Sequence, residues 1–211
     1  SYPDHERDTR AKGVPMMGEG RVWPVEESTI SVPAIEIPPF WFQIAGCDFG
    51  WDHPAAGARL AWDRDNDVVY LTDCYKRSGE TPVYHASKLK AWGQWLPVAW
   101  PHDGLNTEKA SGKVLKDEYA RHGANMMYFS ARYDDKKGGR QDVEPSVLDL
   151  YERMRTGRFK AFAHLEDFWE EFRMYHRKDG KIVPRNDDII SALRYGSMML
   201  RYAAQKTGPR L

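Results

Sequence analysis

The sequence predicts an α/β domain in which helices flank a mixed central sheet. Two patterns carry this prediction. Three apolar runs of strand length follow one another in the first half of the chain, and helix-like segments then alternate with further short apolar runs. A block of strands followed by alternating helices and strands is typical of mixed sheets covered by helices.

Residues 1–40 differ from the rest, because they hold six of the 13 prolines. Proline fixes φ and removes a backbone donor, so Pro24, Pro33, Pro38 and Pro39 interrupt every candidate element. We expect an extended N-terminal arm or linker that packs along a domain of residues 41–211 without forming its core. The sequence contains no Gly-x-x-x-x-Gly-Lys-Ser/Thr phosphate loop, which indicates that no NTPase core lies on this chain.

The first elements of the domain read as an antiparallel meander. Residues 41–50 form an apolar run that ends in Asp and Gly, and residues 56–62 and 68–75 are two further strand-like runs. The polar segment 63–67 between the last two predicts a turn.

The later elements follow from local signals. Gly123 is a helix C-cap signal, Pro145 suits a first helical position, and Asp179-Gly180 is a hairpin signal. The predicted helices cover residues 82–95, 113–122, 145–156, 165–175 and 188–204. The predicted strands cover 96–100 and 125–129, with a hairpin over 177–183.

Two aspartates stand where short buried strands end. Asp48 closes the run 41–50 and Asp103 follows the run 96–100, and a glycine comes soon after each. Aspartate favours turns, so each could simply stabilise its loop. If the two strands are parallel neighbours, however, both carboxylates meet at one edge of the sheet, as a divalent-cation site requires.

A third acidic position opens the last predicted helix. Asp187 and Asp188 follow Asn186, and helix capping explains one of these residues but not easily the run of three. Ala192 and Gly196 follow on the same side of the helix, where small residues would let the helix start lie close to the strand ends.

Carboxylates without a Cys or His cage suit a hard cation such as Mg²⁺. Two such ions would activate a water molecule and stabilise the leaving 3′-oxygen in an in-line displacement. This chemistry needs no side-chain nucleophile, and we find no Ser/His or Cys/His signature.

Together these features resemble the nuclease domain of the large terminase subunit of tailed double-stranded DNA bacteriophages. The resemblance rests on Asp48-Phe49-Gly50 after its strand, the meander, the segment 101–104 and the segment 187–195, and it covers nearly the whole chain. It implies an RNase H-like fold. It also implies metal-dependent endonucleolytic cutting of concatemeric viral DNA during packaging.

The resemblance also implies partners and a location. These are double-stranded DNA, a small terminase subunit, a portal protein and an ATPase domain that precedes this one in the same polypeptide, all in the cytoplasm of the infected host cell. Residues 1–40 would then be the linker from that missing ATPase domain. No membrane association is expected.

The resemblance assigns the metal ligands residue by residue. Asp48 and Asp103 match the first two carboxylates, and the third falls on Asp187 or Asp188. Many relatives have Asp-Ala-Leu where this chain has Ser191-Ala192-Leu193, so both aspartates stay as candidates. The implied cofactor is Mg²⁺ or Mn²⁺, with two ions bound.

Possible DNA contacts lie near the second aspartate. Residues 105–141 hold eight Lys or Arg against five Asp or Glu, although such charges are more often a solvated surface. The candidates are His102, Lys109, Lys113, Lys116, Lys136, Lys137 and Arg140. We also expect the hairpin 177–183 to border the site and control access to it.

The overall charge argues against tight stand-alone DNA binding, since 31 basic residues balance 31 acidic ones. Three other functions stay open. These are a resolvase or transposase-type nuclease of the same fold, a carbohydrate hydrolase with paired carboxylates, and a non-catalytic module that docks on a portal.

Overall fold

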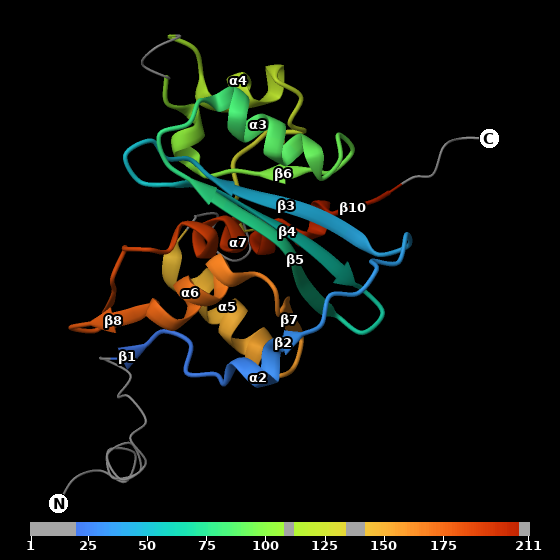
Figure 1. The fold of residues 1–211 in the computed structure, drawn as a ribbon, viewed down its shortest axis with the longest axis vertical. Coiled ribbons are helices and arrows are strands. Elements are labelled where there is room, and N and C mark those ends of the chain that lie inside the picture. The colour runs from blue at the N-terminus through green and yellow to red at the C-terminus, as the bar shows by residue number, and fades with distance from the viewer. Residues whose placement is uncertain (1–19, 108–111, 134–141, 207–211) are drawn as a thin grey trace, which may run out of the picture.

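A computed structural model describes residues 20–107, 112–133 and 142–206. A seven-stranded mixed sheet runs through the domain in the order β10-β3-β4-β5-β7-β2, and β6 pairs with β3 on the edge that β10 also uses (Figure 1). Its strands are β2 (Ser31–Val32), β3 (Phe42–Asp48), β4 (Ala55–Asp63), β5 (Val68–Arg77), β6 (Val98–Ala99), β7 (Phe159–Phe162) and β10 (Ala204–Gln205).

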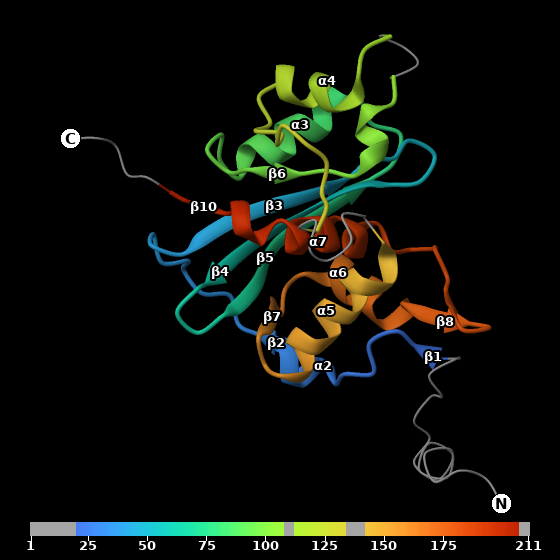
Figure 2. The ribbon, with the colours of Figure 1, turned by 180° about the vertical axis from the view of Figure 1, so that it is seen from behind.

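Helices cover both faces of this sheet. Figure 2 shows α3 and α4 on one side and α5, α6 and α7 on the other. The α-helices are α2 (Glu27–Ile30), α3 (Pro82–Ala91), α4 (Leu115–Arg121), α5 (Val143–Arg155), α6 (Glu166–Met174) and α7 (Asp188–Met198). Two 3₁₀ turns, His102–Leu105 and Leu200–Tyr202, follow β6 and α7. The predicted mixed sheet flanked by helices is confirmed.

Alternation along β3 separates two cores. Ala45 and Cys47 face the α3 and α4 side, whereas Ile44 belongs to the larger core under α5, α6 and α7. Because side chains on a strand alternate between faces, Asp48 shares the α7 side with Ile44 and Gly46. The strand therefore delivers its terminal carboxylate toward α7.

The predicted meander and hairpin are confirmed. β3, β4 and β5 pair antiparallel in sequence order. A second, three-stranded sheet contains β1 (Gly20–Arg21), β8 (His176–Lys178) and β9 (Lys181–Ile182), and the turn between β8 and β9 has Asp179 and Gly180 at φ values of 51° and 75°. Positive φ at both positions is what an Asp-Gly hairpin turn requires.

Several element boundaries differ from prediction. Residues 125–129 form no strand, because only Met126 makes a bridge, to Val98. Helix α5 begins at Val143, so Pro145 is its third residue. Helix α7 ends at Met198, where the chain tightens into a 3₁₀ turn and then pairs with β3 through β10. Strand β7 was not predicted, since its four residues lie in the short connection between two predicted helices.

The described part of the expected arm, residues 20–40, enters the domain more deeply than predicted. Trp23 and Ile30 are fully buried in the larger core, and β2 pairs parallel with β7. The Trp23 indole also donates a hydrogen bond to the Val147 carbonyl on α5 at 3.0 Å. This segment therefore contributes to the core instead of lying along its outside. In the described residues, no helix is both long and apolar enough to cross a membrane.

Candidate metal centre

Adjacent parallel strands deliver the first two aspartates to one edge of the sheet. β3 and β6 pair parallel, with Ala45 opposite Val98 and Gly46 opposite Ala99. Asp48 is the last residue of β3, and Asp103 lies in the 3₁₀ turn that follows β6. The condition that the sequence analysis set, that these two strands are parallel neighbours, is therefore met.

Helix α7 brings the third acidic position to the same edge through a very close backbone contact. A Cβ atom added to Gly46 would overlap the Ala192 carbonyl oxygen and the Gly196 amide nitrogen. Only glycine therefore allows β3 and α7 to touch at this depth. The contact lies two residues before Asp48 and four residues after Asp188, so it sets the distance between the two acidic positions.

A buried glutamate fixes the first turn of α7. Glu171 on α6 is completely buried, and its Oε2 accepts hydrogen bonds from the backbone amides of Ile189 and Ile190 at 2.9 and 3.1 Å. Its Oε1 accepts one from Lys76 Nζ at 3.2 Å. The first amides of a helix lack partners within the helix, so Glu171 supplies them from another element. Burial raises the pKa of Glu171 to about 7, and these donors oppose the rise.

The same edge carries an electrostatic conflict. Burial raises the pKa of Asp48 well above its usual value, and the charges of Asp103, Asp188 and Asp187 raise it further. Burial also raises the pKa of Asp187 and of Asp188. Among the described residues, none donates a hydrogen bond to the Asp48 side chain. Carboxylates in this state favour either a proton or a cation.

Asp103 is the most open of the four. The residue is exposed, yet its carboxyl group is partly removed from water, which raises its pKa. Hydrogen bonds from its own amide and from that of Gly104 oppose this rise. It therefore lies at the rim of the acidic cluster.

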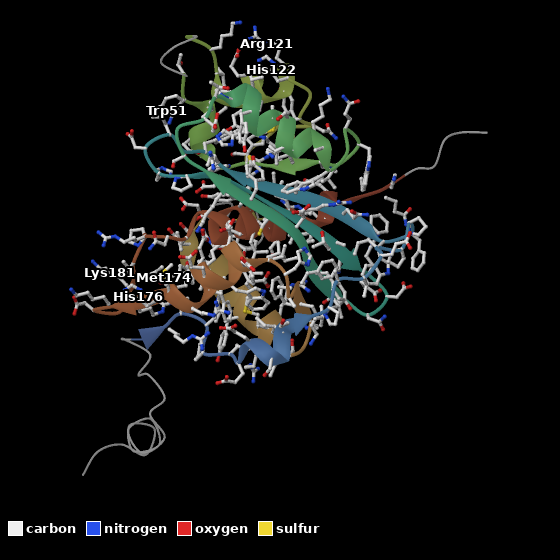
Figure 3. The ribbon with its side chains drawn as sticks, viewed as in Figure 1. Trp51, Arg121, His122, Met174, His176 and Lys181 are labelled. Carbon is white, nitrogen blue, oxygen red and sulfur yellow. The ribbon has the colours of Figure 1, made fainter. Side chains whose placement is uncertain are left out.

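A cavity of about 640 Å³ opens on these side chains. Asp48, Asp187 and Asp188 line it, together with His53 and Pro54 of the β3–β4 loop and Lys181 and Ile182 of the hairpin, whereas Asp103 is not part of its lining. Figure 3 shows Trp51 of that loop and Lys181 of the hairpin on the same side of the molecule. The hairpin thus borders the cavity, as the sequence predicts, while its control of access stays a prediction.

The donors present suit a hard divalent cation, since they are carboxylate oxygens with open lone pairs. In the described ranges, however, no three His, Cys, Asp or Glu side chains are spaced to hold a metal ion as they stand. Their donor chemistry fits a hard divalent cation, although their spacing in this structure does not yet form a closed ligand set.

The predicted DNA contacts occupy different places. His102 is exposed beside Asp103. Lys113 lies 3.7 Å from Glu118. Lys116 contacts Asp117 and lies over the Trp100 ring. Neither lysine is among the residues that line the cavity. The remaining candidates lie outside the described residues, namely Lys109, Lys136, Lys137 and Arg140.

Sequence reasoning missed three residues of this centre. His53 Nδ1 lies 3.4 Å from Asp188 Oδ1, and Glu171 and Arg194 are buried behind the carboxylates. One signal was available for Glu171, because it falls on the apolar stripe of Phe168 and Phe172, where a charge needs a partner. No local pattern distinguishes His53 from an ordinary loop histidine.

Comparison with known proteins decides the family. The family described as terminase RNaseH-like domain matches residues 45–200. The chain belongs to this family. It is 46% identical over 204 residues to the large terminase subunit of Salmonella phage P22. This match covers 96% of this chain and 40% of that protein. The chain therefore spans about two fifths of the length of this relative.

Solved structures of terminase nucleases share the fold. The nuclease domain of the P22 large terminase superposes with a TM-score of 0.81 at 44% identity, covering 90% of this chain and 97% of that one. The nuclease domain of the bacteriophage SPP1 large terminase, solved with bound Mn, has a TM-score of 0.57 at 16% identity, covering 82% and 97%. The predicted RNase H-like fold and the predicted terminase family are confirmed.

Proposed function

We propose that this chain is the nuclease part of a large terminase subunit, an endonuclease that cuts concatemeric viral double-stranded DNA during genome packaging. One observation carries the proposal. Carboxylates from segments far apart in the sequence meet at one edge of the sheet, and the most buried of them, Asp48, has no hydrogen-bond donor in the described part of the chain. The nuclease identity of the 44% identical P22 domain supports this reading.

The proposed cofactor is Mg²⁺ or Mn²⁺, with two ions bound. Asp48 and one or both of Asp187 and Asp188 would hold the cations from the cavity wall, and Asp103 would complete the set from the rim. Cations bound there would supply an activated water molecule and stabilise the leaving 3′-oxygen. The SPP1 domain of the same fold was solved with bound Mn, which supports a divalent cation here.

Other residues of the chain would orient the carboxylates. Gly46 and Glu171 fix where α7 begins, and so fix Asp187 and Asp188 relative to Asp48. We propose that DNA approaches across the cavity mouth between the β3–β4 loop and the hairpin, where Lys181 and Arg185 supply positive charge beside the acidic wall.

The wider assignment follows from the family. We propose that residues 1–40 connect to an ATPase domain of the same polypeptide, and that a small terminase subunit and a portal protein are its partners. Its place of action would be the cytoplasm of the infected cell. The match of the chain to 40% of the P22 large subunit leaves room for such a domain.

Plasmid cleavage tests the proposal. With Mg²⁺ or Mn²⁺ the protein should nick and cut supercoiled DNA, EDTA should stop the reaction, and Asp48→Asn should be inactive while remaining folded. Cutting that persists in EDTA or in Asp48→Asn would contradict the proposed site. A strong preference for branched over linear duplexes would favour a resolvase-type enzyme, and failure to bind any divalent cation would favour the docking module.

A further inference from the structure

Arg194 is a buried cation behind the acidic wall. It lies on α7 two turns after Asp187, is only 3% exposed, and lines the same cavity as Asp48, Asp187 and Asp188. An arginine buried to this extent needs compensation for the water it has lost, because an isolated charge in the interior is costly.

Among the described residues, one hydrogen bond holds its side chain. Arg194 Nε donates to Ser146 Oγ on α5 at 2.7 Å. The Ser146 hydroxyl lies 2.8 Å from the Val143 carbonyl, to which it can donate, so its oxygen is free to accept from the arginine. The Nη2 atom of Arg194 is buried and has no hydrogen-bond partner among the described residues. Ser146 therefore holds the guanidinium in place, but no carboxylate forms an ion pair with it in the described structure.

Two other sheltered arginines in the domain, Arg153 and Arg177, pair directly with a carboxylate, whereas Arg59 is held by the amide oxygen of Gln43. Arg153 lies 3.1 Å from Asp67, and Arg177 binds both oxygens of Glu144 at 2.7 and 2.6 Å. In the described structure, Arg194 forms no ion pair with any carboxylate. Its guanidinium carbon lies 5.5 Å from the centre of the Tyr195 ring, and the rest of its compensation comes through space from neighbouring carboxylates, those of Asp48 and Glu144 included. In agreement, burial and the neighbouring aspartates raise the pKa of Asp48, and Arg194 opposes that rise.

We propose that Arg194 is the resident counter-charge of the metal centre, balancing the carboxylates when no divalent cation is bound and lowering the affinity for the cation when one arrives. The inference rests on the proposed function, because it takes the carboxylates to be metal ligands. Arg194 and the cation compete for the same negative charge, and such coupling is reciprocal. Arg194 is thus a positioning residue that adjusts metal binding.

Thermal unfolding and Mn²⁺ titration calorimetry test this inference. Arg194→Met keeps the length of the side chain and removes its charge. Its unfolding midpoint should fall more in EDTA than in saturating Mn²⁺, and its Mn²⁺ Kd should tighten by about fivefold or more, the lower end of coupling between sites. A side chain that only packs would lower the midpoint equally in both buffers.

Arg153→Met is the matched control, because it removes a sheltered arginine whose partner, Asp67, lies away from the cavity. It should lower both midpoints alike and leave the Mn²⁺ Kd unchanged. Equal losses in both buffers for Arg194→Met, with an unchanged or weaker Kd, would overturn the inference.

A double variant keeps the test decisive if Arg194→Met alone does not fold. Adding Asp48→Asn removes one unbalanced carboxylate, so the double variant should regain stability in EDTA. A double variant that is still unfolded would overturn the inference. If the wild-type protein binds no Mn²⁺, the proposed function fails, whereas the EDTA midpoints of this cycle still decide the role of Arg194.

Discussion

Two aspartates near opposite ends of β4 have opposite surroundings. Asp67, in the β4–β5 turn, accepts hydrogen bonds from Trp62 Nε1 at 3.0 Å, from Arg153 at 3.1 Å and from Arg158 at 2.9 Å. Although burial raises the pKa of Asp67, these donors outweigh it and hold the pKa below its usual value.

Asp48 stands close to the other end of β4 and has none of this support. Burial and three neighbouring aspartates raise its pKa instead. The comparison points to two uses of one residue type in one sheet. Under the proposed function, the carboxylate that stabilises the fold has its lone pairs occupied, whereas the one that would bind a cation keeps them open, at a cost to the fold.

Of the variants at Asp48, Glu171 and Asp67, Asp48→Asn should change DNA cleavage the most. We expect DNA cleavage to fall by roughly 10³-fold, because losing several kcal/mol of charge stabilisation corresponds to that factor. We also expect stability in EDTA to rise, because one repelling charge is removed. Plasmid nicking and urea unfolding measure the two effects, and a variant that is less stable and fully active would contradict them.

Glu171→Gln should have the next largest effect, since it loosens the start of α7. The amide oxygen can still accept from Ile189 and Ile190, but the amide group no longer pairs with Lys76. Residues that support metal ligands typically contribute about 10- to 100-fold to affinity or activity, and we expect a loss in this range in Mn²⁺ affinity.

Glu27→Gln is the matched control for this variant. It breaks an ion pair between Glu27 and Arg173 on the outside of the same helix α6, and calorimetry should show an unchanged Mn²⁺ Kd. If the two variants bind Mn²⁺ equally well, Glu171 does not position the site.

The pH dependence of stability should also separate the two regions. The Asp48 pKa is raised in the folded protein, so the unfolded chain releases its proton first as the pH rises above about 4. In EDTA this group therefore lowers the free energy of unfolding between that pH and its folded pKa. The difference in stability between wild type and Asp48→Asn should grow across this window and shrink when Mn²⁺ is present. A difference that is constant with pH would contradict the raised pKa.

Asp67→Asn should give the smallest effect and no loss of cleavage. Asp67 has a φ of 50°, which asparagine adopts readily, so the change removes charge with little backbone strain. The partly exposed ion pairs contribute little, and we expect about 1 kcal/mol less stability in urea unfolding. Reduced cleavage in a folded Asp67→Asn protein would show that the two regions are not independent.

The regions also differ in how far the sequence predicts them. The carboxylates at 48, 103 and 187–188 were found because each follows a local pattern, a strand end or a helix start. Glu171 and Arg194 were missed because their roles depend on contacts with β5, α5 and the cavity. The apolar stripe of α6 distinguishes Glu171 from Glu170 in the sequence, but only the packing of α6 against α7 shows which backbone amides it binds.

The same limit applied to the fold. Strands β3 to β5 were predicted because each is long enough to show its pattern. β2, β7 and β10 have four residues or fewer, and their pairing partners lie far away in the sequence. The burial of Trp23 could not be predicted either, because the prolines around it are equally typical of an exposed linker.

Anomalous diffraction from a crystal soaked in Mn²⁺ tests the central claim most directly. We predict at least one strong manganese peak bounded by the carboxylates of Asp48 and of Asp187 or Asp188, with Asp103 at its outer side, and no such peak in Asp48→Asn crystals. Manganese found only elsewhere on the protein, or a peak unchanged by Asp48→Asn, would contradict the assignment of this edge of the sheet as the metal centre.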